Sequence, residues 1–547
     1  MLHQSNANLL RIRKVKCDEE KPHCKRCTST GRKCDGYDPN FRPSPPTTPP
    51  QSVTSSTRGQ LQRLTSRGIN RSPSPLYLVP ALRFNTVEER ESFDFFTSNA
   101  VVSLRGFLDS SFWEREVLQA AHREPAIQHC IVALGAMHRR FFEGRRSHIN
   151  EEHMSDKYLQ FALRQSNQAI QDLVGKQGLS GSMVKTDRVT LMTCSILFIS
   201  MSCLQGYQKD AFEHLRSGIR MLNEMDSEEN AKPENHPVDM DSLRSLFIGL
   251  DLQARSIMPT AQFRNWVPTP KLKTPASLPN PELNMASLLA MVRYMETLLN
   301  HLHAFFQGIM SRRTEETNDI YLEYSDLITR FNRGSAILEI LCEKSSSNAD
   351  EFSQPLTVLR LLQCQIEYLL RSPRSDVEDK FKLTMKSTSF DDLFDEPFDH
   401  STQLVKMFEL ATRLLPLSSS SSPVFTTTMG ALSALWLVAF RAPSTCATLR
   451  KRAVTLMLSH PRREGFWDAM VAGRVAQEAL RLEQESTQAE LGFSFNPTQD
   501  VIVPDDLRMI AVAVSYVDDN KRRARVEYVN SRDLKAGNPG WVRWINW

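Results

Sequence analysis

The chain of 547 residues is long enough to bury a large core and to hold more than one folded unit, and its hydrophobic content of 41% is ordinary for globular protein. The net charge of +4 is uneven: residues 1–37 carry nine Lys or Arg against four acidic residues, a net +5, which leaves the remaining chain at −1. A basic head on a near-neutral body indicates a polyanionic partner for the head alone.

Neither secretion nor membrane insertion is indicated. The first sixteen residues lack an apolar core and end in basic residues, so we expect no secretory signal and a reducing compartment without disulfides. The six cysteines outside the head are therefore expected to be small buried hydrophobes. Two apolar runs, 189–204 and 424–440, are shorter than about 18 clean apolar residues and contain Ser or Thr, which favours buried core helices over membrane spans.

Residues 11–37 hold four of the ten cysteines at short spacings. Cys24 and Cys27 form a C-x2-C pair, and Cys17 and Cys34 each lie six intervening residues away from it. Such a density of cysteines is typical of a metal site, because thiolates are preferred ligands of zinc. Basic residues lie before and between the cysteines, among them Arg11, Arg13, Lys14, Lys16, Lys25 and Arg32.

This stretch resembles the fungal binuclear zinc-cluster transcription factors, in which six cysteines share two zinc ions. The family pattern is two copies of C-x2-C-x6-C joined by a short loop. Cys24, Cys27 and Cys34 match the second copy in full, and Cys17 matches the end of the first. The resemblance implies zinc as the cofactor, the nucleus as the location and double-stranded DNA as the partner.

The resemblance also assigns roles to the basic residues. In the family a short helix before the third cysteine enters the major groove, where a lysine reads guanine. By motif position that residue is Lys14, with Arg13 beside it, and both types suit the O6 and N7 acceptors of guanine. The remaining basic residues would meet phosphates, which position the protein without reading sequence; they are Arg11, Lys16, Lys25 and Arg32. The alternative is a basic nuclear-import patch that reads no bases.

The first copy of the pattern is incomplete. Its opening cysteines should stand at positions 7 and 10, where this chain has Ala7 and Leu10. Four sulfurs complete only one tetrahedral all-thiolate site, so these cysteines can hold at most one zinc. Either the start of the chain is wrongly assigned, or the head is degenerate and holds one zinc or none.

A linker and a helical body follow the head. Residues 41–82 are rich in Pro, Ser and Thr, a composition that cannot bury enough surface to order the chain. They contain no sustained heptad repeat, so a coiled-coil dimer is not indicated, and a homodimer or a heterodimer formed in another way stays open.

The body reads as mainly all-α. Helical periodicity runs through residues 88–104, then through a face that consists of Ile127, Cys130, Ile131, Leu134 and Met137, and through a third face that consists of Leu288, Met291, Val292, Met295, Leu298 and Leu299. Further helical patterns are expected at 426–440, 464–485 and 505–517, with breaks at 226–240 and 257–282. The closely spaced Trp541, Trp544 and Trp547 are expected to pack back onto the body.

Two of the helices carry a second resemblance. Residues 124–141, EPAIQHCIVALGAMHRRF, and residues 213–222, EHLRSGIRML, are similar to segments of the fungal-specific regulatory domain that accompanies zinc clusters. The expected division is a zinc-cluster module at 1–40 with its first half degenerate or missing, a disordered linker at 41–82, an α-helical fungal-specific transcription factor domain at 83–517, and a C-terminal tail at 518–547.

An acidic and aromatic run at 390–400, FDDLFDEPFDH, is a candidate activation segment. Acidic residues would keep it soluble while apolar side chains dock into the groove of a transcriptional coactivator; these side chains are Phe390, Leu393, Phe394 and Phe398. An ordinary loop between helices is the alternative, and the composition does not separate the two.

Taken together, these features predict a nuclear, sequence-specific DNA-binding regulator of RNA polymerase II genes, an activator of a metabolic or secondary-metabolite gene set. The alternative is a helical interaction protein that has lost autonomous DNA binding and acts through a partner. No metalloprotease, P-loop or nucleophile-elbow motif is present, so an enzyme is not expected. His122, His129 and His138 are expected to be structural histidines with satisfied hydrogen bonds.

Overall fold

The computed structural model is mostly helical over the residues it describes, which confirms the predicted mainly all-α class. The described residues are 82–107, 110–143, 156–175, 187–227, 236–258, 266–270, 281–309, 317–345, 352–372, 394, 397–416, 423–492, 502–518 and 523–546. All of them belong to one unit, Leu78–Trp547. The predicted head, and the linker up to residue 81, lie outside them.

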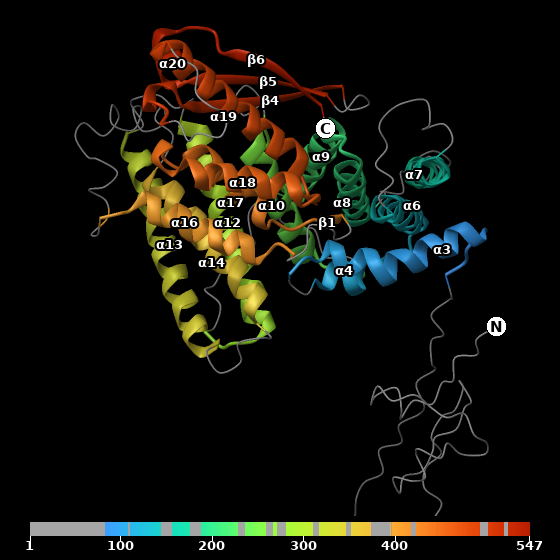
Figure 1. Ribbon diagram of the computed structural model, residues 1–547. Coiled ribbons are helices and arrows are strands. Elements are labelled where there is room, and N and C mark those ends of the chain that lie inside the picture. Colours follow the sequence, from blue (N-terminus) through green and yellow to red (C-terminus); the bar gives the residue numbers. More distant parts are fainter. Residues whose placement is uncertain are drawn as a thin grey trace, which may run out of the picture. The chain divides into compact units, whose positions relative to one another are not determined.

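The first half of this unit packs around one apolar core, which we call the N-terminal core. The predicted face of α6 is buried in it from Ile127 to Met137, and Pro125 starts that helix as expected. The elements, coloured blue to green in Figure 1, are α3 (Val87–Phe95), the π-helical η1 (Phe96–Ala100), α4 (Val101–Leu104), the π-helical η2 (Phe112–Glu116), α5 (Val117–Ala121), α6 (Pro125–Phe142), α7 (Lys157–Gly175), α8 (Arg188–Gln205), α9 (Gln208–Ser227) and α10 (Met240–Ile257).

One of these helices, α8, contains the first apolar run. It is long and apolar enough to cross a membrane by length and composition, but 72% of its residues are buried inside the body. Asp187 caps its start by accepting hydrogen bonds from the N–H groups of Val189 and Thr190. Gly206 ends it in the left-handed conformation, at φ 83°. This burial confirms the prediction that the run at 189–204 is a core helix.

A second apolar core, the central core, forms from the middle of the chain. The predicted face of Leu288 to Leu299 is buried in it. Its elements are α12 (Met285–Ile309), α13 (Thr317–Ser345), α14 (Ser353–Arg371), α16 (His400–Arg413), α17 (Ala431–Arg441), α18 (Ala447–Ser459), β3 (Trp467–Asp468) and α19 (Ala469–Leu491). The short strands β1 (Val424–Thr426) and β2 (Arg462–Glu464) also form in this half of the chain, and Phe425 of β1 is buried in the N-terminal core.

The helices expected at 426–440 and 464–485 start later than predicted. Residues 424–426 and 462–468 instead build a small sheet of order β1-β2-β3, parallel between β1 and β2 and antiparallel between β2 and β3. Helix α19 begins where Asp468 accepts hydrogen bonds from the N–H groups of Met470 and Val471. The apolar periodicity therefore predicted both helices correctly but not the residues at which they begin.

The hairpin at 462–468 joins the two cores. At its tip Phe466 is buried in the N-terminal core, and the next residue, Trp467, is buried in the central core. Gln253 of α10 holds this tip: its Nε2 donates to the carbonyl of Thr427 at 2.8 Å, and its Oε1 accepts from the N–H of Phe466 at 3.1 Å. The Nε1 of Trp467 donates to Ser256, also on α10, at 3.0 Å.

The carboxylate of Glu464, in β2, is fully buried at the start of α17. It accepts hydrogen bonds at 3.0 Å from the N–H groups of Gly430, Ala431 and Leu432, and it lies 2.8 Å from the Nε of Arg462. These N–H groups are among those that a helix start leaves unpaired, so helix and carboxylate satisfy each other. A Cβ on residue 430 would lie 2.6 Å from a carboxylate oxygen, which explains glycine at that position.

The predicted helix at 505–517 is wrong: after the 3-10 turn η7 (Asp505–Leu507) this segment is a strand. Its alternation of Val512, Val514 and Tyr516 with small residues suits a pleated strand, and β-branched residues favour it. It is the first strand of an antiparallel sheet of order β4-β5-β6, shown in red in Figure 1; the elements here are β4 (Met509–Asp518), β5 (Arg523–Asn530), α20 (Ser531–Ala536) and β6 (Trp541–Asn546).

This sheet packs on α19 and forms a third apolar cluster with it. Trp541 packs against that cluster, as expected. Trp544 is 45% exposed, and the guanidinium carbon of Arg523 lies 4.1 Å from the centroid of the Trp544 ring. Trp547 lies outside the described residues. The pairing of β4 with β5 joins residues on both sides of the boundary between 517 and 518, at which the tail was predicted to start.

Replacing Glu464 by alanine should lower the free energy of unfolding by about 3–5 kcal/mol, because Arg462 and three helix N–H groups would lose their buried acceptor. Glu485→Ala is the matched control, since Glu485 on α19 is 50% exposed in its pair with Arg481 and such pairs contribute about 0–1 kcal/mol. Urea unfolding followed by tryptophan fluorescence measures both variants. Equal losses would contradict the role assigned to Glu464.

Candidate functional site

The predicted zinc and DNA ligands all lie in the head, outside the described residues. They are Cys17, Cys24, Cys27 and Cys34 for zinc, and Arg11, Arg13, Lys14, Lys16, Lys25 and Arg32 for DNA. Within the described ranges, no group of three or more His, Cys, Asp or Glu is placed to hold a metal ion. The four thiolates of the head fit one tetrahedral zinc and do not fit the two-zinc centre of a six-cysteine cluster.

The other six cysteines are free thiols of the body. Cys130, Cys194, Cys203 and Cys364 are buried, as predicted, while Cys342 and Cys446 are half-buried. Burial raises the pKa of Cys364 to about 11, which keeps this thiol protonated at neutral pH.

Two of the four apolar residues named for the candidate activation segment are described, and both touch the body. Phe394 and Phe398 are half-buried against the central core, and the guanidinium of Arg371, at the end of α14, lies 4.1 Å and 5.1 Å from their ring centroids. Phe398 also lies 4.8 Å from the ring of His400. Phe390 and Leu393 lie outside the described residues. These contacts fit a segment docked on the body and an ordinary loop equally well, so the activation role stays a prediction.

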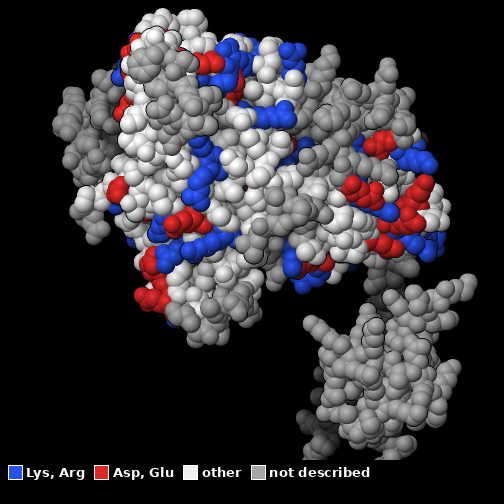
Figure 2. Space-filling view, in the orientation of Figure 1, with Lys and Arg blue, Asp and Glu red and all other residues white. Residues whose placement is uncertain are grey.

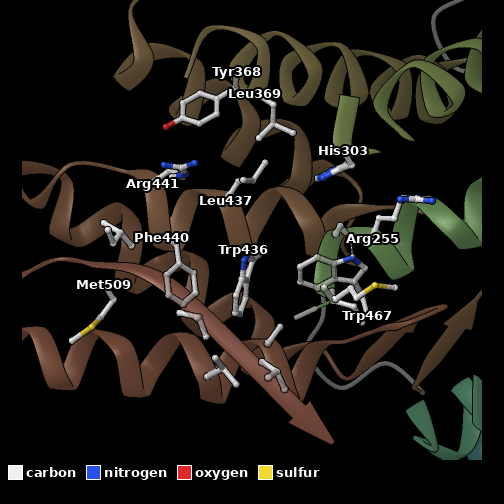
Figure 3. Close-up of a pocket in the computed structure, with 18 of the residues that line it drawn as sticks. Arg255, His303, Tyr368, Leu369, Trp436, Leu437, Phe440, Arg441, Trp467 and Met509 are labelled. Carbon is white, nitrogen blue, oxygen red and sulfur yellow. Dashed lines mark hydrogen bonds between the residues drawn. The ribbon is translucent and has the colours of Figure 1, made fainter. Parts of the chain in front are cut away.

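A cavity of about 620 Å³ lies where α10, α12, α14, α17 and α19 meet β4. One wall is aromatic: the ring centroid of Trp436 is 4.3 Å from that of Phe440 and 5.7 Å from that of Trp467 (Figure 3). Side chains of β4 line it as well, and they include Val512, Val514 and Tyr516. Apolar walls and a volume of this order are typical of a site for a drug-sized molecule, about 300–1,000 Å³.

Polar groups line one end of this cavity. Arg255 and His303 point into the same region in Figure 3. The Nε of Arg255 donates to the buried carboxylate of Asp251 at 2.8 Å, and its Nη1 donates to Gln307 at 3.1 Å. Burial, and then the positive charge of Arg255, lower the pKa of His303 to about 4. His303 is therefore neutral at pH 7, with one ring nitrogen that donates and one that accepts.

A second polar group stands at the other end of the cavity. Tyr368 of α14 is only 3% exposed, and in Figure 3 its hydroxyl points toward the guanidinium of Arg441. Arg508, which precedes β4, lies at the same end and donates to the carbonyls of Phe440 and Ala442. The sequence analysis did not predict this cavity. The aromatic residues at positions 436 and 440 indicate one apolar face of a helix, but their spacing does not show which elements lie opposite that face.

The histidines of α6 depart from expectation in one case. The Nδ1 of His129 is 2.6 Å from the Oε1 of Gln165, as expected of a structural histidine. His138 is 3% exposed among Phe95, Phe141 and Phe425, and neither ring nitrogen has a hydrogen-bond partner among the described residues. Burial lowers the pKa of His138 to about 4. The prediction of satisfied hydrogen bonds is therefore wrong for this residue.

Charge on the body is mixed. On the face drawn in Figure 2, Lys and Arg are interspersed with Asp and Glu across the described residues. That face therefore shows no broad basic surface of the kind that binds a polyanion without sequence preference. The observation agrees with the near-neutral charge of the chain beyond residue 37.

Comparison with known families finds two matches along the chain. The fungal specific transcription factor domain matches residues 91–379, more than half of the chain. The fungal Zn(2)-Cys(6) binuclear cluster domain matches residues 11–44. Both matches fall where the sequence showed a resemblance.

Two curated proteins are similar to this chain. The aspercryptin biosynthesis cluster-specific transcription regulator atnN of Emericella nidulans is 26% identical over 95% of this chain and 92% of its own length. The transcription regulator lscL of Purpureocillium lilacinum is 27% identical over 41% of this chain and 52% of its own length. No solved structure matches the fold.

The unpartnered His138 should make folding sensitive to acid. Because its pKa is about 6.5 unfolded and about 4 folded, only the unfolded chain takes up a proton between these values, so stability is lost as pH falls from 6.5 toward 4. His138→Phe should remove this proton uptake. Between pH 7 and pH 5 the variant should lose roughly 2 kcal/mol less unfolding free energy than the wild type.

Urea unfolding at the two pH values measures this difference. His129→Gln, a change to a hydrogen-bonded histidine of the same helix, serves as the control and should keep the acid sensitivity of the wild type. The assignment to His138 fails if His138→Phe and the wild type lose the same stability.

Proposed function

The chain belongs to the family of fungal-specific transcription factors, and from that premise we propose that it is a DNA-binding regulator of a set of biosynthetic genes. The observation that carries the proposal is the presence of both family matches, at 11–44 and 91–379, in one chain. The two similar proteins are named as transcription regulators, and one of them as specific to a biosynthesis cluster. Transcription regulators of this family are not enzymes.

The head supplies the contact with DNA. One zinc held by the thiolates of Cys17, Cys24, Cys27 and Cys34 would fix the chain around the basic residues. Lys14, with Arg13, would face guanine in the major groove, and Arg11, Lys16, Lys25 and Arg32 would bind phosphates. A homodimer or heterodimer would place two heads on two half-sites of double-stranded DNA. The site of action is the nucleus, where these genes lie.

We favour an activator. The support is the acidic and aromatic run at 390–400, whose composition suits a coactivator groove. The contact of Phe394 and Phe398 with the body means that such docking would first have to release them. Transcript levels of the biosynthetic genes in a deletion strain decide the sign of regulation: a fall supports activation, and a rise supports repression.

The alternative proposal is an interaction protein that reaches DNA through a partner. It is favoured by the absence of cysteine at positions 7 and 10. The two proposals differ in whether the purified chain binds DNA by itself.

Zinc content and DNA binding should be measured on the same sample of the full-length protein. We expect about one zinc per chain by elemental analysis, because four thiolates complete one tetrahedral site. Cys24→Ser should lower both the zinc content and the DNA affinity. Cys364→Ser, which changes a buried thiol of α14, should leave both unchanged. A wild-type protein with neither zinc nor DNA binding would favour the interaction protein.

The assigned roles of two basic residues can be separated. Lys14→Ala should reduce the preference for the correct base by about 1–3 kcal/mol at one position of the site. Arg32→Ala should weaken binding to all sequences alike, and it should reduce the slope of log affinity against log salt concentration by about one, the loss of one phosphate contact. Binding to a set of DNA duplexes at several salt concentrations, after a site has been selected from random sequence, measures both. Equal effects of the two changes would count against this assignment.

A further inference from the structure

The cavity beside β4 has a tyrosine hydroxyl on its wall. Tyr368 is 3% exposed and lines the cavity, and its hydroxyl makes no hydrogen bond with any described residue. Tyrosine hydroxyls in such surroundings usually find a hydrogen-bond partner, and here the cavity is where one would lie. His303, at the other end, likewise makes no hydrogen bond within the described part of the chain. An oxygen-bearing molecule in the cavity would satisfy both groups.

The charges around the cavity favour an anion at the Tyr368 end. Arg441 lines this end, and Arg508 reaches it while bonding only to carbonyl groups, which carry no charge. Asp468 and Asp505 also line the cavity. Asp468 is already paired with Arg463 at 2.6 Å and caps α19, and Asp505 is exposed. Among the described lining residues, this end therefore carries two guanidinium groups, and the carboxylate of Asp468 is already engaged.

The middle of the cavity favours an apolar body. Trp436, Phe440 and Trp467 offer ring faces and edges (Figure 3). Val512 and Val514 of β4 also line the cavity and offer aliphatic contacts. Aromatic walls with a few convergent polar groups are typical of small-molecule sites. An extended, partly aromatic molecule would bury the most surface here, because its hydrogen-bonding groups would lie at its two ends.

We propose that this cavity binds an organic acid with an extended apolar or aromatic body. Its acid group lies between the Tyr368 hydroxyl and the Arg441 guanidinium, and a carbonyl or hydroxyl lies at His303. The ligand is a small-molecule effector of the regulator, a role that rests on the proposed function, whereas the binding itself does not.

Binding couples the C-terminal sheet to the helical body. The strand β4 supplies one wall of the cavity, and α14 and α17 supply the other side. A ligand held between them adds contacts that exist only while the sheet is packed in place, so it stabilises that packing by mass action. The same side of the cavity contains Tyr368 and His400, whose rings contact Phe398 of the acidic and aromatic run.

Two fluorescent probes test the site in the full-length protein. 1-Anilinonaphthalene-8-sulfonate is an aromatic anion, and N-phenyl-1-naphthylamine is its neutral counterpart without the sulfonate. We expect each to bind once per chain. Leu437→Trp, which fills the cavity from α17, should weaken both probes about tenfold or more, whereas Arg441→Gln should weaken the anion about tenfold and leave the neutral probe unchanged.

Matched changes outside the cavity serve as controls. Leu163→Trp alters an exposed leucine of α7, Arg481→Gln alters an exposed arginine of α19, and neither should change binding of either probe. Near-UV circular dichroism establishes that each variant is folded. Should Leu437→Trp fail to fold, Val514→Phe fills the cavity from the side of β4 and should have the same effect.

Each outcome decides the proposal. Failure of both probes to saturate at one per chain, or equal weakening by Leu163→Trp and Leu437→Trp, overturns the site. Equal weakening of the two probes by Arg441→Gln overturns the placement of the acid group. DNA binding is measured on the same samples, so a chain that binds probes without binding DNA contradicts the proposed function and not the cavity.

Discussion

The buried carboxylate of Glu464 is the interaction on which the arrangement of the body depends. An unpaired carboxylate without water would be expensive to bury, and the start of α17 supplies three N–H donors and Arg462 supplies a positive charge. This fixes the hairpin 462–468 against α17. Since Phe466 enters the N-terminal core and Trp467 the central core, one short segment sets how two sets of helices meet. The arrangement is specific because any other register would leave the charge unsatisfied.

Local sequence patterns predicted the parts of the fold that local interactions determine. The face from Ile127 to Met137 and the face from Leu288 to Leu299 are buried as their spacing required, because a helix places such residues on one side. The hairpin could not be predicted in this way. Its strands are three and two residues long, and its charged residues are buried. The partners of these charges include backbone groups distant in sequence, such as the N–H groups of 430–432 for Glu464 and the carbonyl of Leu204 for Arg463. The prediction of a helix at 505–517 was wrong for a related reason. This segment is stabilised as a strand by its pairing with β5, which the local sequence pattern does not reveal.

The two candidate sites also differ in how far apart their residues lie in the sequence. The predicted zinc site could be found from the sequence because its four ligands, Cys17, Cys24, Cys27 and Cys34, lie within eighteen residues. The cavity draws its lining from nine elements between residues 255 and 516, so its residues are brought together only by the fold. Its chemistry, an aromatic wall with Tyr368 and His303 at opposite ends, exists only after the chain has folded.

The central core has a further consequence for where the chain can be divided. The family match ends at residue 379, but the core is continuous from Leu252 to Ala476, so helices on both sides of that point bury their apolar faces against each other. A fragment that stops at 379 would lack α16 to α19, and α14, which packs against α16, would lose that cover. Sequence similarity ends in the middle of a folding unit here. An insertion or a gene fusion at that position would disturb the interior as much as a change in the matched domain itself.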